Sequence, residues 1–221
     1  MKTVSIKLVL LTTIISPLSC LLASCGNSYS SINIIELIKT AADTFINEKK
    51  NNPNNTYFLL LGDNSDGTAI SLFTNQEAGG DLLESFHPHY SVLGNHELYY
   101  DVDKYLNPNS KSSFTKSLGI ECYLSCNSYW YDDTTAEYCN YFKPYVIEKI
   151  GDLNVGFVGY TTSNIQGLPS TTKTLFLAEA SDNENEFLDT GMTGTEILQK
   201  AIDDCHNDAL NLNNGVKPDV V

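Results

Sequence analysis

The sequence contains no arginine: all 13 basic residues are lysines, set against 27 aspartates and glutamates. The formal net charge is −14. Such an acidic chain offers no basic face for nucleic acid or anionic lipid, so we expect neither partner. It also lacks the planar guanidinium that binds phosphate through two hydrogen bonds. Bound divalent cations would be needed to reverse the local charge before this chain could attract a phosphate ligand.

Long apolar runs are scarce at the N-terminus as well. The run from Leu8 to Ile15 is too short to cross a bilayer. Lys2 and Lys7 precede it, and small residues follow it. This order is typical of a secretory signal, so we expect residues 1–25 to be removed on export and to lie outside the fold.

The signal segment resembles that of a bacterial lipoprotein, with cleavage before Cys25 and lipid attached to its thiol. Cys20 is an alternative lipidation site, and a cleaved signal without lipid is the alternative interpretation. The resemblance implies an exported protein at the cell surface. A lipid anchor would hold the protein on the bacterial membrane without crossing it.

Four cysteines remain beyond the signal segment, namely Cys122, Cys126, Cys139 and Cys205. An even number of thiols outside the cytosol permits disulfides, but the sequence does not determine a pairing. Cys122 and Cys126 lie close in sequence, yet no histidine lies near them. A structural zinc site at these cysteines is therefore the less favoured interpretation.

Residues 26–221 suffice for one domain with a sizeable core, and they contain no repeat. Helix and strand patterns alternate along them, which predicts helices packed outside a central mixed sheet. The expected helices cover residues 34–46, about 80–86, 111–118 and 197–205. The expected strands cover residues 57–61, 90–93 and 120–125, a hairpin of 145–150 and 153–160, and a strand that begins at Pro218. Residues 163–193 are polar and are expected to form a surface excursion.

Two of these strands end in similar ways, about thirty residues apart. The first runs into Gly62 and Asp63, and the second runs into Gly94, Asn95 and His96. In an α/β sheet, ligands bind just past the carboxyl ends of the strands, so these side chains should share one crevice. A carboxylate, a carboxamide oxygen and an imidazole suit Mg²⁺, Mn²⁺, Fe or Zn²⁺.

The blocks Gly62-Asp63 and Gly94-Asn95-His96-Glu97 resemble the second and third motifs of the calcineurin-like metallophosphoesterases. The bacterial 5'-nucleotidase branch of that family shares further segments in the same order. These segments are Asp66-Gly67-Thr68, Ser125-Cys126-Asn127, Lys143-Pro144-Tyr145-Val146-Ile147 and residues 154–162. The resemblance extends over roughly residues 31–221 and implies a four-layer αββα sandwich.

The resemblance also implies roles for the site residues. Asp63 matches a carboxylate that bridges two metal ions, and Asn95 matches a ligand of one of them. His96 matches the histidine that contacts the phosphoryl group or assists the leaving oxygen, which suits an imidazole near neutral pH. Glu97 is expected to support the loop without touching metal. The implied reaction is metal-dependent hydrolysis of a small phosphate ester such as a nucleotide, while the substrate-binding residues stay unassigned.

Three departures from the family pattern point to an incomplete catalytic domain. No Asp-x-His motif, which ends the first strand in the family, occurs in this sequence. Tyr99 stands where nucleotidase relatives carry the aspartate that holds the histidine. The remaining family histidines lie beyond the strand that starts at Pro218, and His206 does not match them. We therefore expect a sandwich that is truncated at its C-terminus and lacks the first strand motif. The alternative function is an inactive exported lipoprotein that keeps the fold as a binding or interaction module.

Simpler interpretations exist for several of these residues. Asp63 and Asn95 could belong to ordinary turns, because Asp and Asn tolerate left-handed backbone. His87 and His89 flank a proline and are expected to be turn residues, not ligands. The aromatic side chains between residues 129 and 142 could stack on a nucleobase, although packing or surface contact is the favoured role.

Overall fold

The structure, a computed structural model, describes residues 7–11, 40, 43–44, 46–52, 56–63, 88–97, 123–161, 176–178, 187–188 and 191–221. A parallel sheet contains the strands β1 (Lys7–Leu11), β2 (Thr56–Leu60) and β3 (Tyr90–Ser91), in that order. The strands predicted at 57–61 and 90–93 are thus confirmed. β3 is shorter than predicted, although the Val92 N–H still donates to Leu60 O at 3.2 Å.

β1 lies within residues 1–25, which we expect to be removed with the signal. It pairs with β2 along its whole length, from Lys7 opposite Thr56 to Leu11 opposite Leu60. The physical reason is that the edge of β2 carries backbone groups that need partners, and an extended apolar segment supplies them. The sequence of β1 holds no Asp-x-His, which agrees with the expected lack of the first strand motif.

β2 is buried on alternating positions, as a strand beneath a neighbouring layer should be. Thr56, Phe58 and Leu60 are buried, whereas Tyr57 and Leu59 are half-buried. Successive side chains of a strand point to opposite faces, so both faces of β2 are covered to different degrees. A short helical segment, residues 46–51, precedes β2 and ends before Pro53 as predicted.

The predicted hairpin is confirmed as β6 (Tyr145–Ile150) and β7 (Leu153–Val158), although β7 ends two residues earlier than predicted. Its turn consists of Gly151 and Asp152, and Gly151 has φ 61°. A two-residue turn with glycine in the left-handed region matches the right-handed twist of the flanking strands. The local sequence was therefore sufficient to predict this element.

The hairpin faces the parallel sheet through a cluster of aromatic side chains. The ring of Phe157 on β7 lies 5.8 Å, between centroids, from both the Tyr57 ring on β2 and the Tyr90 ring on β3. The carboxylate of Glu148 on β6 accepts hydrogen bonds from the hydroxyls of Tyr57 and Tyr90. Apolar contact and satisfied polar groups together join the two sheets.

Helix α7 (Gly194–Asn207) packs on the β6–β7 hairpin. Thr193 caps its N-terminus in a capping box with Glu196, and Asp208 ends it in left-handed conformation. Its apolar face buries Ile197, Ala201 and Cys205, which confirms the predicted helix and its inward positions.

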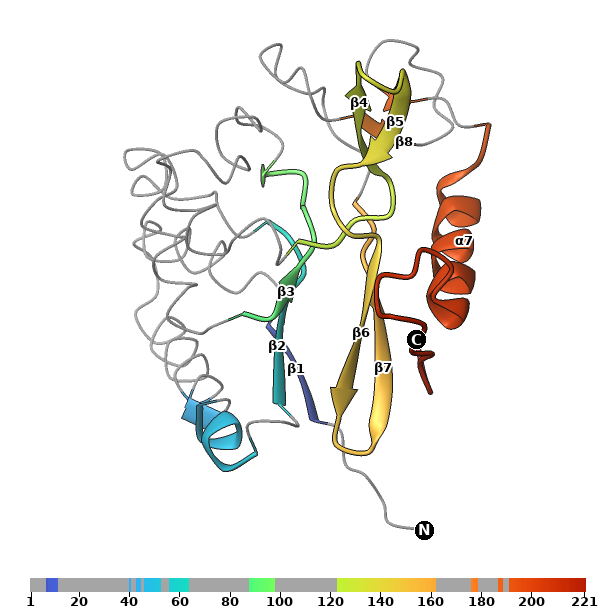
Figure 1. The fold of residues 1–221 in the computed structure, drawn as a ribbon. Helices are drawn as coiled ribbons and strands as arrows, with labels where there is room; N and C mark the ends of the chain where they lie inside the picture. The colour runs from blue at the N-terminus through green and yellow to red at the C-terminus, as the bar shows by residue number, and fades with distance from the viewer. Residues whose placement is uncertain are drawn as a thin grey trace, which may run out of the picture.

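The layers follow the expected αββα order. In Figure 1 the helical residues 46–51 and α7 lie on opposite sides of the strands, with the parallel sheet and the β6–β7 hairpin between them. In the described part of the chain, no helix combines the length and apolar character that a bilayer span requires.

A further sheet caps one end of the molecule, in the order β5-β4-β8-β9. Its strands are β4 (Ser128–Asp132), β5 (Glu137–Asn140), β8 (Phe176–Ala178) and β9 (Phe187–Leu188). The expectation that residues 163–193 form only a surface excursion is wrong in part. The two short strands β8 and β9 extend the sheet, because β8 pairs with the open edge of β4 and β9 pairs with β8.

Residues 123–125 join the parallel sheet to the second layer. The Leu124 N–H donates to Ser91 O at 2.8 Å, and the Ser125 N–H donates to Lys143 O at 3.0 Å. Within the strand predicted at 120–125, the structure has two isolated β-bridges, at Tyr123 and Leu124. At the C-terminus, Val220 forms a parallel bridge with Val155, in line with the strand predicted from Pro218. The predicted helices at 80–86 and 111–118 lie outside the described residues.

Candidate metal site

Asp63 follows β2 directly and is turned toward the next loop by two residues with unusual backbone. Gly62 has φ 85° and Asp63 has φ 55°. Glycine adopts positive φ at little cost, and aspartate is among the few side chains that tolerate it. The strand therefore ends abruptly, and the carboxylate of Asp63 lies past its carboxyl end.

The loop after β3 packs against this turn, backbone to backbone. A Cβ added to Gly62 would lie 2.5 Å from the nitrogen of Gly94. A Cβ added to Gly94 would lie 2.1 Å from Oδ1 of Asp63. No side chain fits at either position without displacing its neighbour, so both glycines are required by the close approach.

Two hydrogen bonds join the two loops, and a third lies within the loop after β3. Oε2 of Glu97 accepts the N–H of Asp63 at 2.9 Å and the N–H of Gly94 at 2.7 Å. In return, Oδ1 of Asp63 accepts the N–H of His96 at 3.1 Å. Glu97 is only 3% exposed, so this carboxylate is held by charge-assisted bonds in a buried place. Its geometry agrees with the supporting role expected from the sequence.

The structure thus brings Asp63, Asn95 and His96 to one corner of the parallel sheet. All three are half-buried, which leaves them accessible to a ligand. The left-handed backbone of Asp63 also agrees with the alternative that it belongs to an ordinary turn. Their role as metal ligands stays a prediction. Cys25, the predicted lipidation site, and Tyr99 lie outside the described residues.

The side chains at this corner are of chemical types that bind divalent cations. A carboxylate, a carboxamide oxygen and an imidazole are ligands for Mg²⁺, Mn²⁺, Fe or Zn²⁺. Three donors supply only part of the four to six that such ions take. Among the described residues, no group of three His, Cys, Asp or Glu side chains gathers to hold a metal.

A buried polar network joins Ser125, Asn127 and Thr161. The Asn127 amide donates to Thr161 O at 2.8 Å, and its carbonyl accepts the Thr161 N–H at 2.9 Å. The Ser125 hydroxyl lies 2.9 Å from the Thr161 hydroxyl and donates to the Asn127 carbonyl at 3.0 Å. All three side chains are fully buried, so this network fixes the segment after β7 against the 123–128 segment.

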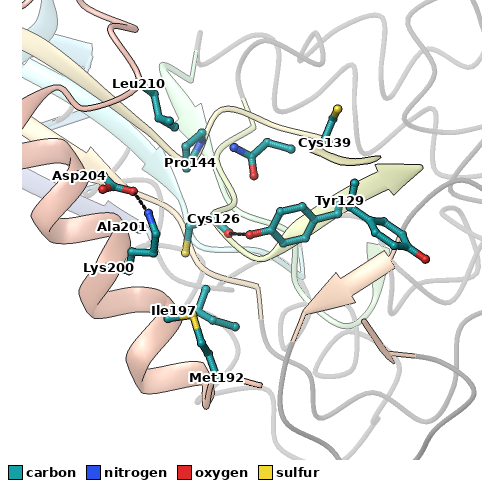
Figure 2. Close-up of a pocket in the computed structure, with 12 residues that line it drawn as sticks. Cys126, Tyr129, Cys139, Pro144, Met192, Ile197, Lys200, Ala201, Asp204 and Leu210 are labelled. Atoms are coloured by element: carbon teal, nitrogen blue, oxygen red, sulfur yellow. Dashed lines mark hydrogen bonds and ion pairs between the residues drawn. The ribbon is translucent and has the colours of Figure 1, made fainter. Parts of the chain in front are cut away.

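A cavity of about 440 Å³ lies elsewhere, between α7 and the β4–β5 hairpin (Figure 2). Its lining includes Cys126, Tyr129, Ile197 and the Lys200–Asp204 ion pair. Asp63, Asn95 and His96 are not part of this lining. The candidate chemistry and this cavity are therefore separate features of the molecule.

The described thiols are unpaired. Cys126, Cys139 and Cys205 are free cysteines. Burial raises the pKa of Cys126 to about 12 and, together with the charge of Asp208, raises the pKa of Cys205 to about 11. These two thiols are therefore protonated at neutral pH and suit apolar packing better than metal binding. Disulfides among these three cysteines, which the sequence permitted, are absent.

One polar contact was missed by the sequence analysis. His89, expected to be a turn residue, lies against Lys49 with its Nε2 atom 2.7 Å from Nζ. The two residues are 40 positions apart, so no local pattern links them. Pro88 next to His89 was the only local signal, and it indicates a turn.

Three solved structures are similar to this chain. The NAD nucleotidase of Haemophilus influenzae has 25% identity and a TM-score of 0.44, over 56% of this chain and 22% of that one. A sulfate thiohydrolase of Thermus thermophilus has 21% identity and a TM-score of 0.46, over 73% and 26%. A 5'-nucleotidase precursor, also of Thermus thermophilus, has 24% identity and a TM-score of 0.46, over 78% and 28%. This chain thus matches about a quarter of the length of each relative.

A comparison with curated proteins finds no match. The family model for the calcineurin-like phosphoesterases, in contrast, matches residues 26–210. That range contains the two locked loops, the polar network around Asn127 and helix α7. The chain therefore belongs to the calcineurin-like phosphoesterase family.

Proposed function

We propose that this chain takes part in metal-dependent hydrolysis of phosphate monoesters, with a small ester such as a nucleotide as substrate. One observation carries the proposal. Asp63 and the loop of Asn95 and His96 are joined by hydrogen bonds at the carboxyl ends of two neighbouring parallel strands. This is where α/β proteins bind their ligands, and the family is one of phosphoesterases.

In this proposal the residues have distinct roles. Asp63 and Asn95 supply oxygen ligands to a divalent cation, and His96 gives a proton to the leaving oxygen as a general acid. Glu97 holds both loops in place and does not touch the ion. A bound divalent cation would polarise the phosphoryl oxygens and activate a water molecule. It would also offset the negative charge of this chain where the phosphate binds.

We further propose that the protein is exported and carries lipid on Cys25. The lysines before a short apolar run and the small residues before Cys25 support this. Cleavage before Cys25 would remove β1 and leave the edge of β2 without that partner. Mass spectrometry of the purified mature protein tests it: a start at Cys25 with an added lipid supports export and anchoring, and a retained Lys7–Leu11 segment contradicts them.

Turnover of a chromogenic phosphate monoester with Mn²⁺, Mg²⁺ or Zn²⁺ tests the enzymatic function. We expect metal-dependent phosphate release that Asp63→Ala and His96→Ala each lower at least a hundredfold, the usual contribution of one catalytic group. Asp203→Ala and His206→Ala are matched controls, because both residues are exposed on α7. These controls should keep the full rate.

The outcome separates the two functions considered. Turnover with metal, lost in both site variants and kept in both controls, supports the phosphoesterase. If folded protein shows no turnover with any of the three metals, the result favours the alternative function, a binding or interaction module. Equal loss in site and control variants would show that unfolding, not chemistry, caused the effect.

A further inference from the structure

The cavity beside α7 has the size of a small-molecule site. Its volume is about 440 Å³, within the range of roughly 300–1,000 Å³ that is usual for ligand pockets. Residues of α7 form one wall, and the β4–β5 hairpin lies opposite (Figure 2). The hairpin pairs from Tyr129 opposite Asn140 to Asp132 opposite Glu137. Both walls are regular elements, so the cavity is largely pre-formed.

Apolar and aromatic side chains make up much of the lining. Among them are Tyr129, Met192, Ile197, Ala201 and Leu210. The Tyr129 ring is held in place, because its hydroxyl donates to Cys126 O at 3.2 Å. Ile197 and Ala201 are buried and belong to the core between α7 and Cys126. An apolar group that enters this cavity leaves water and meets a firm surface. The lining therefore favours a ligand with an apolar body.

Two opposite charges border the same cavity. Nζ of Lys200 lies 2.5 Å from Oδ2 of Asp204, one helical turn further along α7, and both residues belong to the lining. An ammonium group has three donors, and a carboxylate has about four acceptor sites. The bond between them therefore leaves each group able to bind a further group of opposite charge. Both remain accessible, since their side chains are 61% and 23% exposed, respectively.

The charge of Asp204 acts inside the cavity. Burial, then the proximity of Cys126 and then that of Asp204, raise the pKa of the Tyr129 hydroxyl. The carboxylate thus lies near enough to the aromatic wall to influence a group bound there. The carboxamide of Asn140 is a further polar member of the lining. The cavity therefore offers an anionic acceptor and a cationic donor side by side, next to an apolar wall.

We propose that this cavity binds a small zwitterion with an apolar body, such as an aromatic amino acid. The ammonium of the ligand donates to Asp204, its carboxylate accepts from Lys200, and its side chain lies against Tyr129 and Ile197. Charge complementarity selects this class. An anion alone would face Asp204 and the net charge of −14, and a cation alone would face Lys200. The candidate metal site lies elsewhere, so this proposal is independent of the phosphoesterase function.

A series of four probes tests the proposal on the unaltered chain. L-phenylalanine carries both charges and an apolar body. 2-Phenylethylamine keeps only the ammonium, 3-phenylpropionate keeps only the carboxylate, and glycine keeps both charges without the apolar body. For a ligand with the size of phenylalanine we expect a Kd of roughly 2 mM. The two singly charged analogues should each bind about fivefold more weakly or worse, because each loses one charge-assisted contact.

NMR titration of the whole isotope-labelled chain measures these affinities and locates the site. Phenylalanine should shift the amide signals of Tyr129, Ile197 and Lys200, which lie in or beside the lining. Glycine should cause no shift at the same concentration. The proposal is overturned if none of the probes binds, or if either singly charged analogue binds as tightly as phenylalanine.

Two variants test the charged pair. Asp204→Asn and Lys200→Gln should each weaken phenylalanine binding about fivefold or more. Asp203→Asn and Lys149→Gln are the matched controls, because both residues are exposed and lie outside the lining. These controls should keep the full affinity. Unchanged affinity in both pocket variants, with amide spectra that show a folded chain, would contradict the proposed contacts.

Cys139 supplies a readout that needs no variant. Its side chain belongs to the lining, so a ligand in the cavity should protect it from alkylation. Saturating phenylalanine should slow the reaction of Cys139 with iodoacetamide about threefold or more, by mass action. Glycine at the same concentration should leave the rate unchanged. If Asp204→Asn or Lys200→Gln does not fold, this comparison decides, and equal rates with phenylalanine and glycine would overturn the proposal.

Discussion

The carboxylate of Glu97 accepts the backbone N–H of Asp63 at 2.9 Å, although the two residues lie 34 positions apart. The same oxygen accepts the N–H of Gly94. Glu97 therefore acts as a clamp between the loops that follow β2 and β3. The position of the Asp63 carboxylate depends on this buried side chain as much as on the strand that precedes it.

Replacing Glu97 with alanine should leave two buried N–H groups without their acceptor. We expect a loss of about 2–4 kcal/mol in the free energy of unfolding, measured with denaturant. Glu97→Gln should cost about 1 kcal/mol, because the amide oxygen still accepts but carries no charge. The control Glu137→Ala, on an exposed position of β5, should change stability by less than about 0.5 kcal/mol. An equally small change for Glu97→Ala would contradict the clamp.

Gly94→Ala should force the two loops apart, because the new Cβ would overlap Oδ1 and the nitrogen of Asp63. We expect a cost of about 3 kcal/mol in thermal or denaturant unfolding. Gly191→Ala is the comparison, since its Cβ would have no heavy atom within 4 Å but its φ is 67°. That substitution should cost about 1 kcal/mol from backbone strain alone. Equal costs would mean that the loops are not in close contact.

Asp208 should make the stability of the C-terminal region depend on pH. Desolvation by burial raises the pKa of this carboxyl, but hydrogen bonds donated by Gly215, Asn213 and Tyr145 outweigh it, so the pKa lies below its ordinary 3.8. A lowered pKa contributes stability that is fully present above pH 3.8 and is lost as pH falls through the folded-state value.

Asp208→Asn removes this contribution. The melting temperature of the variant should therefore lie below that of the unaltered chain at pH 6, and the gap should narrow as pH falls below about 4. Differential scanning calorimetry at pH 3 to 6 measures the melting temperatures of both chains. A gap that does not change with pH would show that the charge of Asp208 contributes nothing.

Alkylation should distinguish the described cysteines. The thiolate is the reactive form, and with a pKa of about 12 roughly one Cys126 thiol in ten thousand is ionised at pH 8. Cys126 and Cys205 are also buried, whereas Cys139 is half-buried. Iodoacetamide at pH 8, followed by peptide mass spectrometry, should modify Cys139 first. In urea all three should react at similar rates, and fast native alkylation of Cys126 would contradict its burial.

Local patterns were enough for the elements whose contacts are local. The β6–β7 hairpin follows from two apolar runs around Gly151 and Asp152, because a two-residue turn sets the register of its strands. The helix α7 follows from apolar positions at helical spacing, because one face must be buried. The strands before Asp63 and Asn95 were predicted for the same reason, and with them the corner at which the site lies.

Other features came only from packing between distant segments. The pairing of β1 with β2 is one of them, since a short apolar run has the same pattern whether it is a cleaved signal or a paired strand. The short strands β8 and β9 carry too few residues for a local pattern, and they become strands by pairing, β8 with β4 and β9 with β8. Residue types alone could not reveal the contact between His89 and Lys49, because the two residues are 40 positions apart in sequence.

The sequence by itself determined the family motifs, the acidic charge and the helices and strands whose periodicity is local. The tertiary structure decided that Glu97 joins the loops of Asp63 and Gly94, that β1 pairs with β2, and that His89 meets Lys49. The physical reason is that hydrogen bonds and close packing between segments 30 or more residues apart depend on three-dimensional position, which no local spacing of residues encodes.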